Sequence, residues 1–241
     1  MAGGAWVLLL APVLLILRVF GSRDPALRAL RGARLCRLWS KGLLRVWGVT
    51  LFVQGEPPPG GAFAVSNHVS WLDILTLASA SPSTYIAKDE IARWPFLGWL
   101  ARLMDTLFID RERARDAVRL GGQLRLLLEQ GVTITMFAEG RSWNGTEILP
   151  FKSALFEVPA ALQVACVPVA VTYRNPGAPG ASTICWWKEM PLLEHIVGVL
   201  KLPRIECTVS YGEPVRGIRD RKKLAAELHR RVEALFVPVP D

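Results

Sequence analysis

The stretch "SNHVSWLD", residues 66–73, holds the side chains best suited to acid–base chemistry. His68 follows Asn67, and Asp73 comes five residues after His68. Ser70 with a carboxylate three residues later has the pattern of a capping box at a helix start. If His68 lies just before that cap, the chain folds back enough for the carboxylate to reach one ring nitrogen. The other nitrogen then faces the crevice as a general base whose tautomer the carboxylate fixes.

The chain contains no G-x-S-x-G setting for a serine or cysteine nucleophile, so such a base would have to activate a substrate hydroxyl directly. The other two histidines, His195 and His229, lack a patterned carboxylate partner, and we interpret both as structural or surface residues.

Two further segments place charged groups directly after a strand-like run. In "FAEGRSWNGTEILPFK", residues 137–152, Glu139, Gly140 and Arg141 follow an apolar run, and Pro-Phe-Lys opens a helix. In "TLFIDRERAR", Arg111 follows a strand and opens a helix. Guanidinium groups at a helix N-terminus suit a phosphate, because the backbone N–H groups and the helix dipole add to their attraction. A solvated helix start is the alternative for the next two arginines of that segment.

Short apolar runs alternate with longer helical patterns after residue 61. The expected strands are residues 62–66, 84–87, 106–109, 132–137, 166–173, 182–187 and 205–211. The expected helices are residues 71–80, 94–104, 112–130, 152–163 and 219–236. This alternation predicts an α/β fold with a mostly parallel sheet and helices on both faces. In such sheets, sites gather where strands end and helices begin.

The clearest linker is "QGEPPPGGA", residues 54–62, whose prolines and glycines fit neither helix nor strand. We therefore expect an N-terminal membrane-associating segment over residues 1–53, a linker over 54–61 and a catalytic domain over 62–241.

The N-terminal segment is both basic and apolar. Residues 1–45 carry eight basic side chains and one acidic one, a net charge of +7, which leaves +1 for the other 196 residues. Residues 2–17 form an uncharged apolar run that is short for a membrane-spanning helix of about 20 residues and lacks the features of a cleaved signal peptide. We expect it to insert into the interface or to act as a short uncleaved anchor. If it spans, the positive-inside rule puts the rest of the chain in the cytoplasm.

The stretch that follows predicts an amphipathic helix. Its apolar side holds Trp39, Leu43, Val46 and Trp47, and its polar side holds Arg37, Lys41 and Arg45. Helices of this kind lie in the headgroup region of anionic membranes. The alternative is that this face packs on the protein's own core. A nucleic-acid partner for the basic segment is disfavoured, because the rest of the chain is nearly neutral and carries no recognised nucleic-acid motif.

The four cysteines, Cys36, Cys166, Cys185 and Cys207, show no C-x-x-C pair and no metal-ligand spacing with the histidines. We expect buried free thiols in a reducing compartment.

Four motifs, in order over residues 60–175, resemble those of the glycerolipid and lysophospholipid acyltransferases, the 1-acylglycerol-3-phosphate acyltransferase group. "NHVSWLD" resembles their N-H-x-x-x-x-D, "DTLFIDR" their G-x-x-F-I-x-R, "FAEGRSW" their F-P-E-G-T-R-S, and "VPVAVTY" their V-P-V with a later aromatic. The "LPFKSALF" run and the C-terminal part look most like the bacterial branch that includes lyso-ornithine lipid acyltransferases.

This chain departs from the family pattern at several positions. Asp105 stands where the second motif has Gly, and Ala138 where the third has Pro. Arg141 takes the usual Thr position and Ser142 the usual Arg position, so the phosphate-reading arginine is displaced by one residue. The choice between lysophosphatidate and another lysolipid as the acceptor therefore stays open.

The resemblance implies an O-acyltransferase of membrane lipid biosynthesis. The donor would be an acyl-carrier-protein (acyl-ACP) or acyl-CoA thioester, and the acceptor a lysolipid hydroxyl, with no bound cofactor, no metal and no acyl-enzyme intermediate. His68 and Asp73 would be catalytic. The implied substrate-binding residues are Asn67, Arg111, Glu139, Gly140, Arg141, Ser142, Lys152 and Pro168.

Such an enzyme would act at the inner, cytoplasmic membrane, with its catalytic domain facing the cytoplasm and its basic segment on the anionic surface. The alternative is a catalytically inactive, membrane-bound lipid-binding protein of the same fold.

Overall fold

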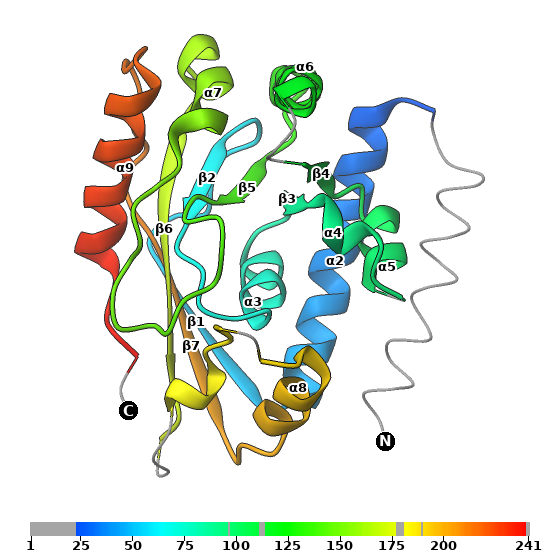
Figure 1. Ribbon diagram of the computed structural model, residues 1–241, viewed down its shortest axis with the longest axis vertical. Coiled ribbons are helices and arrows are strands. Elements are labelled where there is room, and N and C mark those ends of the chain that lie inside the picture. Colours follow the sequence, from blue (N-terminus) through cyan, green and yellow to red (C-terminus); the bar gives the residue numbers. More distant parts are fainter. Residues whose placement is uncertain (1–22, 96, 111–113, 177–180, 189, 240–241) are drawn as a thin grey trace.

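The computed structural model describes residues 23–95, 97–110, 114–176, 181–188 and 190–239 (Figure 1). The apolar run at residues 2–17 lies outside these residues. Within the described parts of the chain, no helix combines the length and apolarity needed to cross a bilayer.

Seven strands form one sheet. They are β1 (Val49–Gln54), β2 (Phe63–Ser66), β3 (Thr84–Lys88), β4 (Leu107–Ile109), β5 (Ile134–Phe137), β6 (Cys166–Arg174) and β7 (Ile205–Tyr211). Their order across the sheet is β1-β7-β6-β2-β5-β3-β4. Every neighbouring pair is parallel except β6 and β7. The predicted α/β class with a mostly parallel sheet is confirmed.

Helices connect the strands and cover both faces of the sheet. They are α2 (Pro25–Val46), α3 (Leu72–Ala80), α4 (Asp89–Ala92), α5 (Leu97–Leu103), α6 (Ala114–Glu129), α7 (Glu157–Leu162), α8 (Leu192–Leu200) and α9 (Arg221–Leu235), with 3₁₀ turns η1 (Ser153–Phe156) and η2 (Ala181–Ile184). Figure 1 shows α9 on one side of the sheet and α2 with α3 on the other. Buried side chains on β6 alternate between the two faces, as expected for a strand covered on both sides.

The α2 helix covers the protein's own core. Trp39 is 7% exposed and Leu43 is 1% exposed, and both belong to the same apolar cluster as Leu72 of α3. The Arg37 guanidinium donates to the Ser79 carbonyl at the end of α3. This arrangement corrects the expectation of a membrane-facing apolar surface for Trp39 and Leu43. Val46, by contrast, is 43% exposed.

Strand β1 is absent from the predicted strands. It pairs in parallel with β7 along its whole length, from Val49 opposite Ile205 to Gln54 opposite Ser210. The described residues before the 54–61 segment therefore form a helix and an edge strand. These two elements share one apolar core with the residues that follow the segment.

Three other local predictions differ from the structure. Residues 182–187 are not a strand: a 3₁₀ turn occupies the first part, and the apolar pattern reflects the burial of Ile184 and Cys185. The expected helix over 94–104 is present as α5 but begins only at Leu97, because Pro95 disfavours a helical conformation in the residue before it. Helix α8 was not among the predicted helices. The four cysteines are all buried and free, as predicted.

Candidate active site

Strands β2 and β5 lie side by side and end together, with Ser66 opposite Phe137. The chain leaves β2 into the loop that carries His68 and leaves β5 into the segment that carries Glu139. Because the two strands are parallel, both loops emerge at the same carboxyl edge of the sheet, where sites of this fold class form. The structure thus brings together two of the three segments singled out in the sequence.

His68 and Asp73 form a close pair. The His68 Nδ1 lies 2.7 Å from the Asp73 Oδ2, and the His68 side chain is 16% exposed while that of Asp73 is 0% exposed. The imidazole stacks on the Phe137 ring, with centroids 4.0 Å apart and planes 17° apart. Nδ1 is engaged by the carboxylate, and Nε2 has no hydrogen-bond partner among the described residues. The pair therefore has the geometry of a general base and the acid that orients it.

The Asp73 carboxylate accepts four hydrogen bonds. Besides His68, Oδ2 accepts from the backbone N–H groups of Val69 at 2.7 Å and Ser70 at 2.9 Å. Oδ1 accepts from the Tyr173 hydroxyl at 2.8 Å. A fully buried carboxylate has lost its water, and these donors replace that water and fix the orientation of the carboxylate toward the imidazole.

The predicted helix cap is wrong in detail. Helix α3 begins at Leu72, and the N-cap position is held by Trp71, whose side chain makes no capping bond. The Ser70 hydroxyl accepts from the Leu72 N–H at 3.4 Å. The other half of a capping box is present, since the Asp73 carboxylate folds back onto the Ser70 N–H. This folding back is what brings the carboxylate to His68.

Glu139 links the loop that carries His68 to the segment around Leu149. It is 3% exposed; its Oε1 accepts from the His68 N–H at 2.6 Å, and its Oε2 accepts from the Leu149 N–H at 2.8 Å. Burial raises the pKa of this carboxyl to about 7, against the lowering effect of the two backbone bonds. Both oxygens are occupied by the protein's own backbone, so the side chain holds the His68 loop to the 137–152 segment.

Asn67 ties the same loop to β6. Its Nδ2 donates to the Val171 carbonyl at 3.0 Å, and its Oδ1 accepts from the Val171 N–H at 2.7 Å. The side chain is buried, and the amide pairs with β6 just beyond the point where β2 ends. Asn67 therefore extends the sheet by one pair of hydrogen bonds.

The segment after Glu139 turns back toward His68. Gly140 has φ +81°, a left-handed conformation that favours glycine. The Arg141 side chain is exposed, and its guanidinium lies 4.7 Å from the centre of the Trp143 ring. The Trp143 N–H in turn donates to the His68 carbonyl at 2.9 Å. Arg141 is thus an exposed cation on a segment that is hydrogen-bonded to the His68 backbone, and Ser142 beside it is half-buried.

Three other sequence-predicted residues have different positions. The Lys152 N–H donates to the Ala138 carbonyl, and its side chain is exposed. Pro168 is buried inside β6 opposite Val65, within the sheet rather than at its carboxyl edge. Arg111 lies outside the described residues.

Sequence reasoning missed Tyr173 as a partner of Asp73. The tyrosine is 0% exposed, and its hydroxyl also lies 3.3 Å from Thr76 Oγ1, which donates to the Asp73 carbonyl. The alternation along β6 and the aromatic residue of the fourth motif were the available signals. Neither signal identifies Asp73, a hundred residues earlier, as the partner.

The remaining histidines have structural partners. His195 Nδ1 lies 3.0 Å from Trp71 Nε1, and its Nε2 lies 3.1 Å from the Cys185 carbonyl. His229 Nδ1 pairs with Glu233 one turn later at 3.2 Å, a carboxylate partner that the sequence analysis did not assign.

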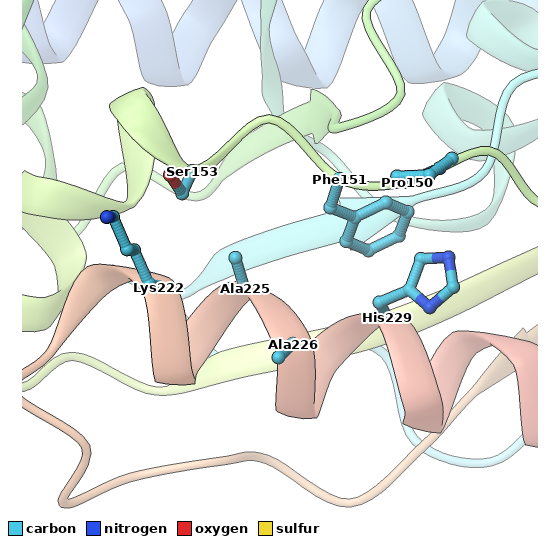
Figure 2. Close-up of a pocket in the computed structure, with 7 residues that line it drawn as sticks. All are labelled: Pro150, Phe151, Ser153, Lys222, Ala225, Ala226 and His229. Atoms are coloured by element: carbon cyan, nitrogen blue, oxygen red, sulfur yellow. The ribbon is translucent and has the colours of Figure 1, made fainter.

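A cleft of about 380 Å³ lies between α9 and the segment around Phe151 (Figure 2). Its lining consists of Pro150, Phe151, Ser153, Lys222, Ala225, Ala226 and His229. Neither His68 nor Asp73 lines it, and the Phe151 and His229 rings meet edge to face across it. We do not assign this cleft to the site.

Comparison with known proteins gives a consistent result. A family model described as Acyltransferase matches residues 51–172. The lyso-ornithine lipid O-acyltransferase of Brucella abortus is 33% identical over 218 residues, covering 84% of this chain and 82% of that protein. A 1-acyl-sn-glycerol-3-phosphate acyltransferase of Neisseria gonorrhoeae is 37% identical over 136 residues, covering 56% of this chain and 52% of that protein.

The crystal structure of the 1-acyl-sn-glycerophosphate acyltransferase of Thermotoga maritima superposes with a TM-score of 0.68 at 19% identity, covering 97% of this chain and 92% of that one. This likeness shows that the two chains share a fold. The family match and the Brucella relative show that this chain belongs to the acyltransferase family.

Proposed function

We propose that the protein transfers a fatty acyl chain from a thioester to the free hydroxyl of a lysolipid. The observation that carries the proposal is the buried pair of His68 and Asp73 at the carboxyl edge of the sheet, with one imidazole nitrogen left for substrate. The sequence relatives support the substrate class, because those described above are named for acyl transfer to lyso-ornithine lipid or to 1-acylglycerol 3-phosphate.

His68 would act first as a base and then as an acid. Its Nε2 takes the proton of the acceptor hydroxyl as that oxygen attacks the thioester carbonyl carbon. Asp73 holds Nδ1–H and stabilises the imidazolium that forms. The carbon–sulfur bond then breaks. His68 gives the proton that it had taken to the leaving sulfur, which departs as a thiol. The thioester supplies the activated acyl group, so the reaction requires no bound cofactor and no metal.

For the acceptor, we propose lyso-ornithine lipid ahead of lysophosphatidate. The Brucella abortus relative, whose match covers 84% of this chain, carries that name. Arg141, the exposed cation near His68, stands one position away from the arginine of the phosphate-reading motif. We infer that Arg141, with Ser142 and Gly140 beside it, contacts the acceptor's polar head. Arg111 and Lys152 are further candidates for this role.

The donor is either acyl-ACP or acyl-CoA, both of which are cytosolic. We place the protein at the inner, cytoplasmic membrane, with the catalytic domain in the cytoplasm. This placement rests on the apolar run at residues 2–17 and on the eight basic side chains of residues 1–45, which suit an anionic surface.

The test is acyl transfer by purified protein with labelled acyl-ACP or acyl-CoA and separate lysolipid acceptors. We expect product with lyso-ornithine lipid, and a loss of roughly 10²–10⁴-fold in His68→Ala, since general acid–base catalysis contributes that much. Asp73→Asn should lose less, because the imidazole itself remains. Near-normal transfer by folded His68→Ala protein would refute the catalytic assignment.

The second candidate is a catalytically inactive lipid-binding protein of the same fold. The observation in its favour is the altered third motif, with Ala138 and Arg141 in place of the family's residues. Stoichiometric lysolipid binding without product, for every acceptor and both donors, would favour it.

A further inference from the structure

Helix α8 exposes a stripe of apolar side chains. Leu193 is 74% exposed, Val197 45% and Leu200 41%, and their spacing of four and three residues puts them on one side of the helix. Met190, just before the helix, is 37% exposed and continues the stripe. The opposite side packs on the core through Val199, which is 1% exposed. The helix is therefore apolar both toward the core and toward the outside.

Lysine and tryptophan side chains flank this stripe. Lys188 is exposed ahead of it, with its ammonium group 3.9 Å from the centre of the Trp187 ring, and Lys201 is exposed directly after the helix. Glu194 is the exposed acid on the helix itself. Half-buried tryptophan and long cationic side chains beside an apolar surface are typical of membrane interfaces.

The helix is fastened to the catalytic loop. His195, on α8, accepts a hydrogen bond at Nδ1 from the Trp71 indole N–H, three residues after His68. The Trp186 N–H, just ahead of α8, donates to the Val69 carbonyl at 2.7 Å. Helix α8 and the segment before it therefore lie beside the loop that carries His68.

We propose that the outward face of α8, formed by Met190, Leu193, Val197 and Leu200, docks on an anionic lipid bilayer and holds the site at the bilayer surface. This inference rests on the proposed function, in which the acceptor is a membrane lipid. A second copy of the chain is a poorer fit, because a stable interface buries about 800 Å² on each partner and four side chains offer much less. The lysines at both ends match anionic headgroups.

A fluorescent probe tests the contact without interference from the N-terminal segment. The variant Leu193→Cys is labelled with an environment-sensitive dye in the full chain; the four native cysteines are buried, so labelling is selective. The matched control is Val118→Cys on α6, where Val118 is 79% exposed and apolar. Figure 1 shows α6 at the opposite end of the molecule from α8.

With vesicles of phosphatidylcholine and phosphatidylglycerol, we expect the probe at position 193 to shift to the blue and to be quenched by lipid-borne quenchers. The probe at position 118 should do neither. Equal responses at the two positions would overturn the proposal. A probe at position 193 that is already shielded without lipid would also overturn it, because the chain itself would then cover this face. A probe that responds to protein concentration alone would overturn it too, because a second copy of the chain would then cover the face.

Activity measurements separate this inference from the proposed function. In the double variant Leu193→Ser with Val197→Ser, we expect the KM for acceptor in vesicles to rise by roughly tenfold, because apolar area at the membrane contact is lost. The kcat with detergent-dispersed acceptor should stay unchanged. Acyl transfer without lipid contact at position 193 would refute only the docking surface; lipid contact without transfer to any lysolipid would refute only the proposed function.

Discussion

At the scale of single residues, the site is organised around one buried carboxylate. Asp73 receives donors from two parts of the chain: the loop after β2, through the His68 imidazole and two backbone N–H groups, and β6, through the Tyr173 hydroxyl. A carboxylate with fewer donors would be costly to bury in its charged form. Each donor therefore helps to hold the carboxylate in place beside the imidazole.

Removal of the tyrosine hydroxyl tests this arrangement. In Tyr173→Phe, Asp73 loses one of four donors while the buried ring remains, and we expect kcat to fall roughly tenfold with little change in KM. Hydrogen bonds to charged groups are worth about 1.5–3 kcal/mol, and each 1.4 kcal/mol is tenfold in rate. The control is Tyr211→Phe, which changes a second buried tyrosine, on β7 instead of β6, and should retain the wild-type kcat. Equal losses in both variants would contradict the role given to Tyr173.

The raised pKa of Glu139 predicts a pH-dependent stability. A carboxyl whose pKa is about 7 when folded and near 4.5 when unfolded stabilises the fold fully below about pH 4.5 and loses that contribution as the pH rises through 7. Relative to Glu139→Gln, which does not titrate, the wild-type free energy of unfolding should fall by about 3 kcal/mol from pH 4.5 to pH 8. Urea unfolding at four pH values measures the difference. A difference that is flat with pH would contradict the shift.

At the scale of elements, the loop between β2 and α3 is held on three sides. Asn67 binds β6, Glu139 binds the loop from the β5 side, and Trp186 binds it from the segment before α8. Loops usually move more than the elements they connect. Here the hydrogen bonds come from neighbouring elements, so the sheet and the segments around it set the position of His68.

The Asn67 amide offers a test at this scale. Asn67→Ala leaves the Val171 N–H and carbonyl unpaired in the interior. Each unsatisfied buried group costs about 1–3 kcal/mol, so we expect the free energy of unfolding to fall by about 2–3 kcal/mol. Asn175→Ala is the matched control: that amide is also buried but has no hydrogen-bond partner among the described residues. Urea unfolding of both variants measures the two free energies of unfolding. An equal loss of stability in the two variants would contradict the role of Asn67 in tying the loop to β6.

At the scale of the whole molecule, the described residues before the 54–61 segment belong to the same apolar core as the residues after it. Helix α2 packs on α3 and contributes Trp39 and Leu43, while β1 completes one edge of the sheet. The described part of this segment therefore cannot be removed without uncovering buried apolar surface.

Two truncations test this. A chain that begins at residue 23 retains α2 and β1, and we expect it to unfold cooperatively on heating. A chain that begins at residue 56 exposes the α3 face and the edge of β7, and we expect it to aggregate or to lack a cooperative transition. Circular dichroism and light scattering measure both. Cooperative unfolding of the shorter chain at a similar Tm would show that residues 62–241 fold independently.

Local patterns in the sequence predicted most of the interior of the sheet. The strands around residues 62–66, 84–87, 132–137, 166–173 and 205–211 are present, because apolar β-rich runs bounded by turn residues have few other structures available. The false strand at 182–187 shows the limit of this rule, since an irregular segment with buried Ile184 and Cys185 has the same pattern. Edge strand β1 was missed because its outer side is exposed and it follows directly on a helix.

For the active site, the sequence by itself determined the pairing of His68 with Asp73, because a five-residue separation across a helix start is a local geometry. It also placed Glu139 at the end of a strand-like run, where sites of such sheets gather. Only the tertiary structure decided the rest. Tyr173 reaches Asp73 across a hundred residues, and α2 buries its apolar face against α3. Periodicity shows that such a face must be covered, but only packing decides whether the core or a membrane covers it.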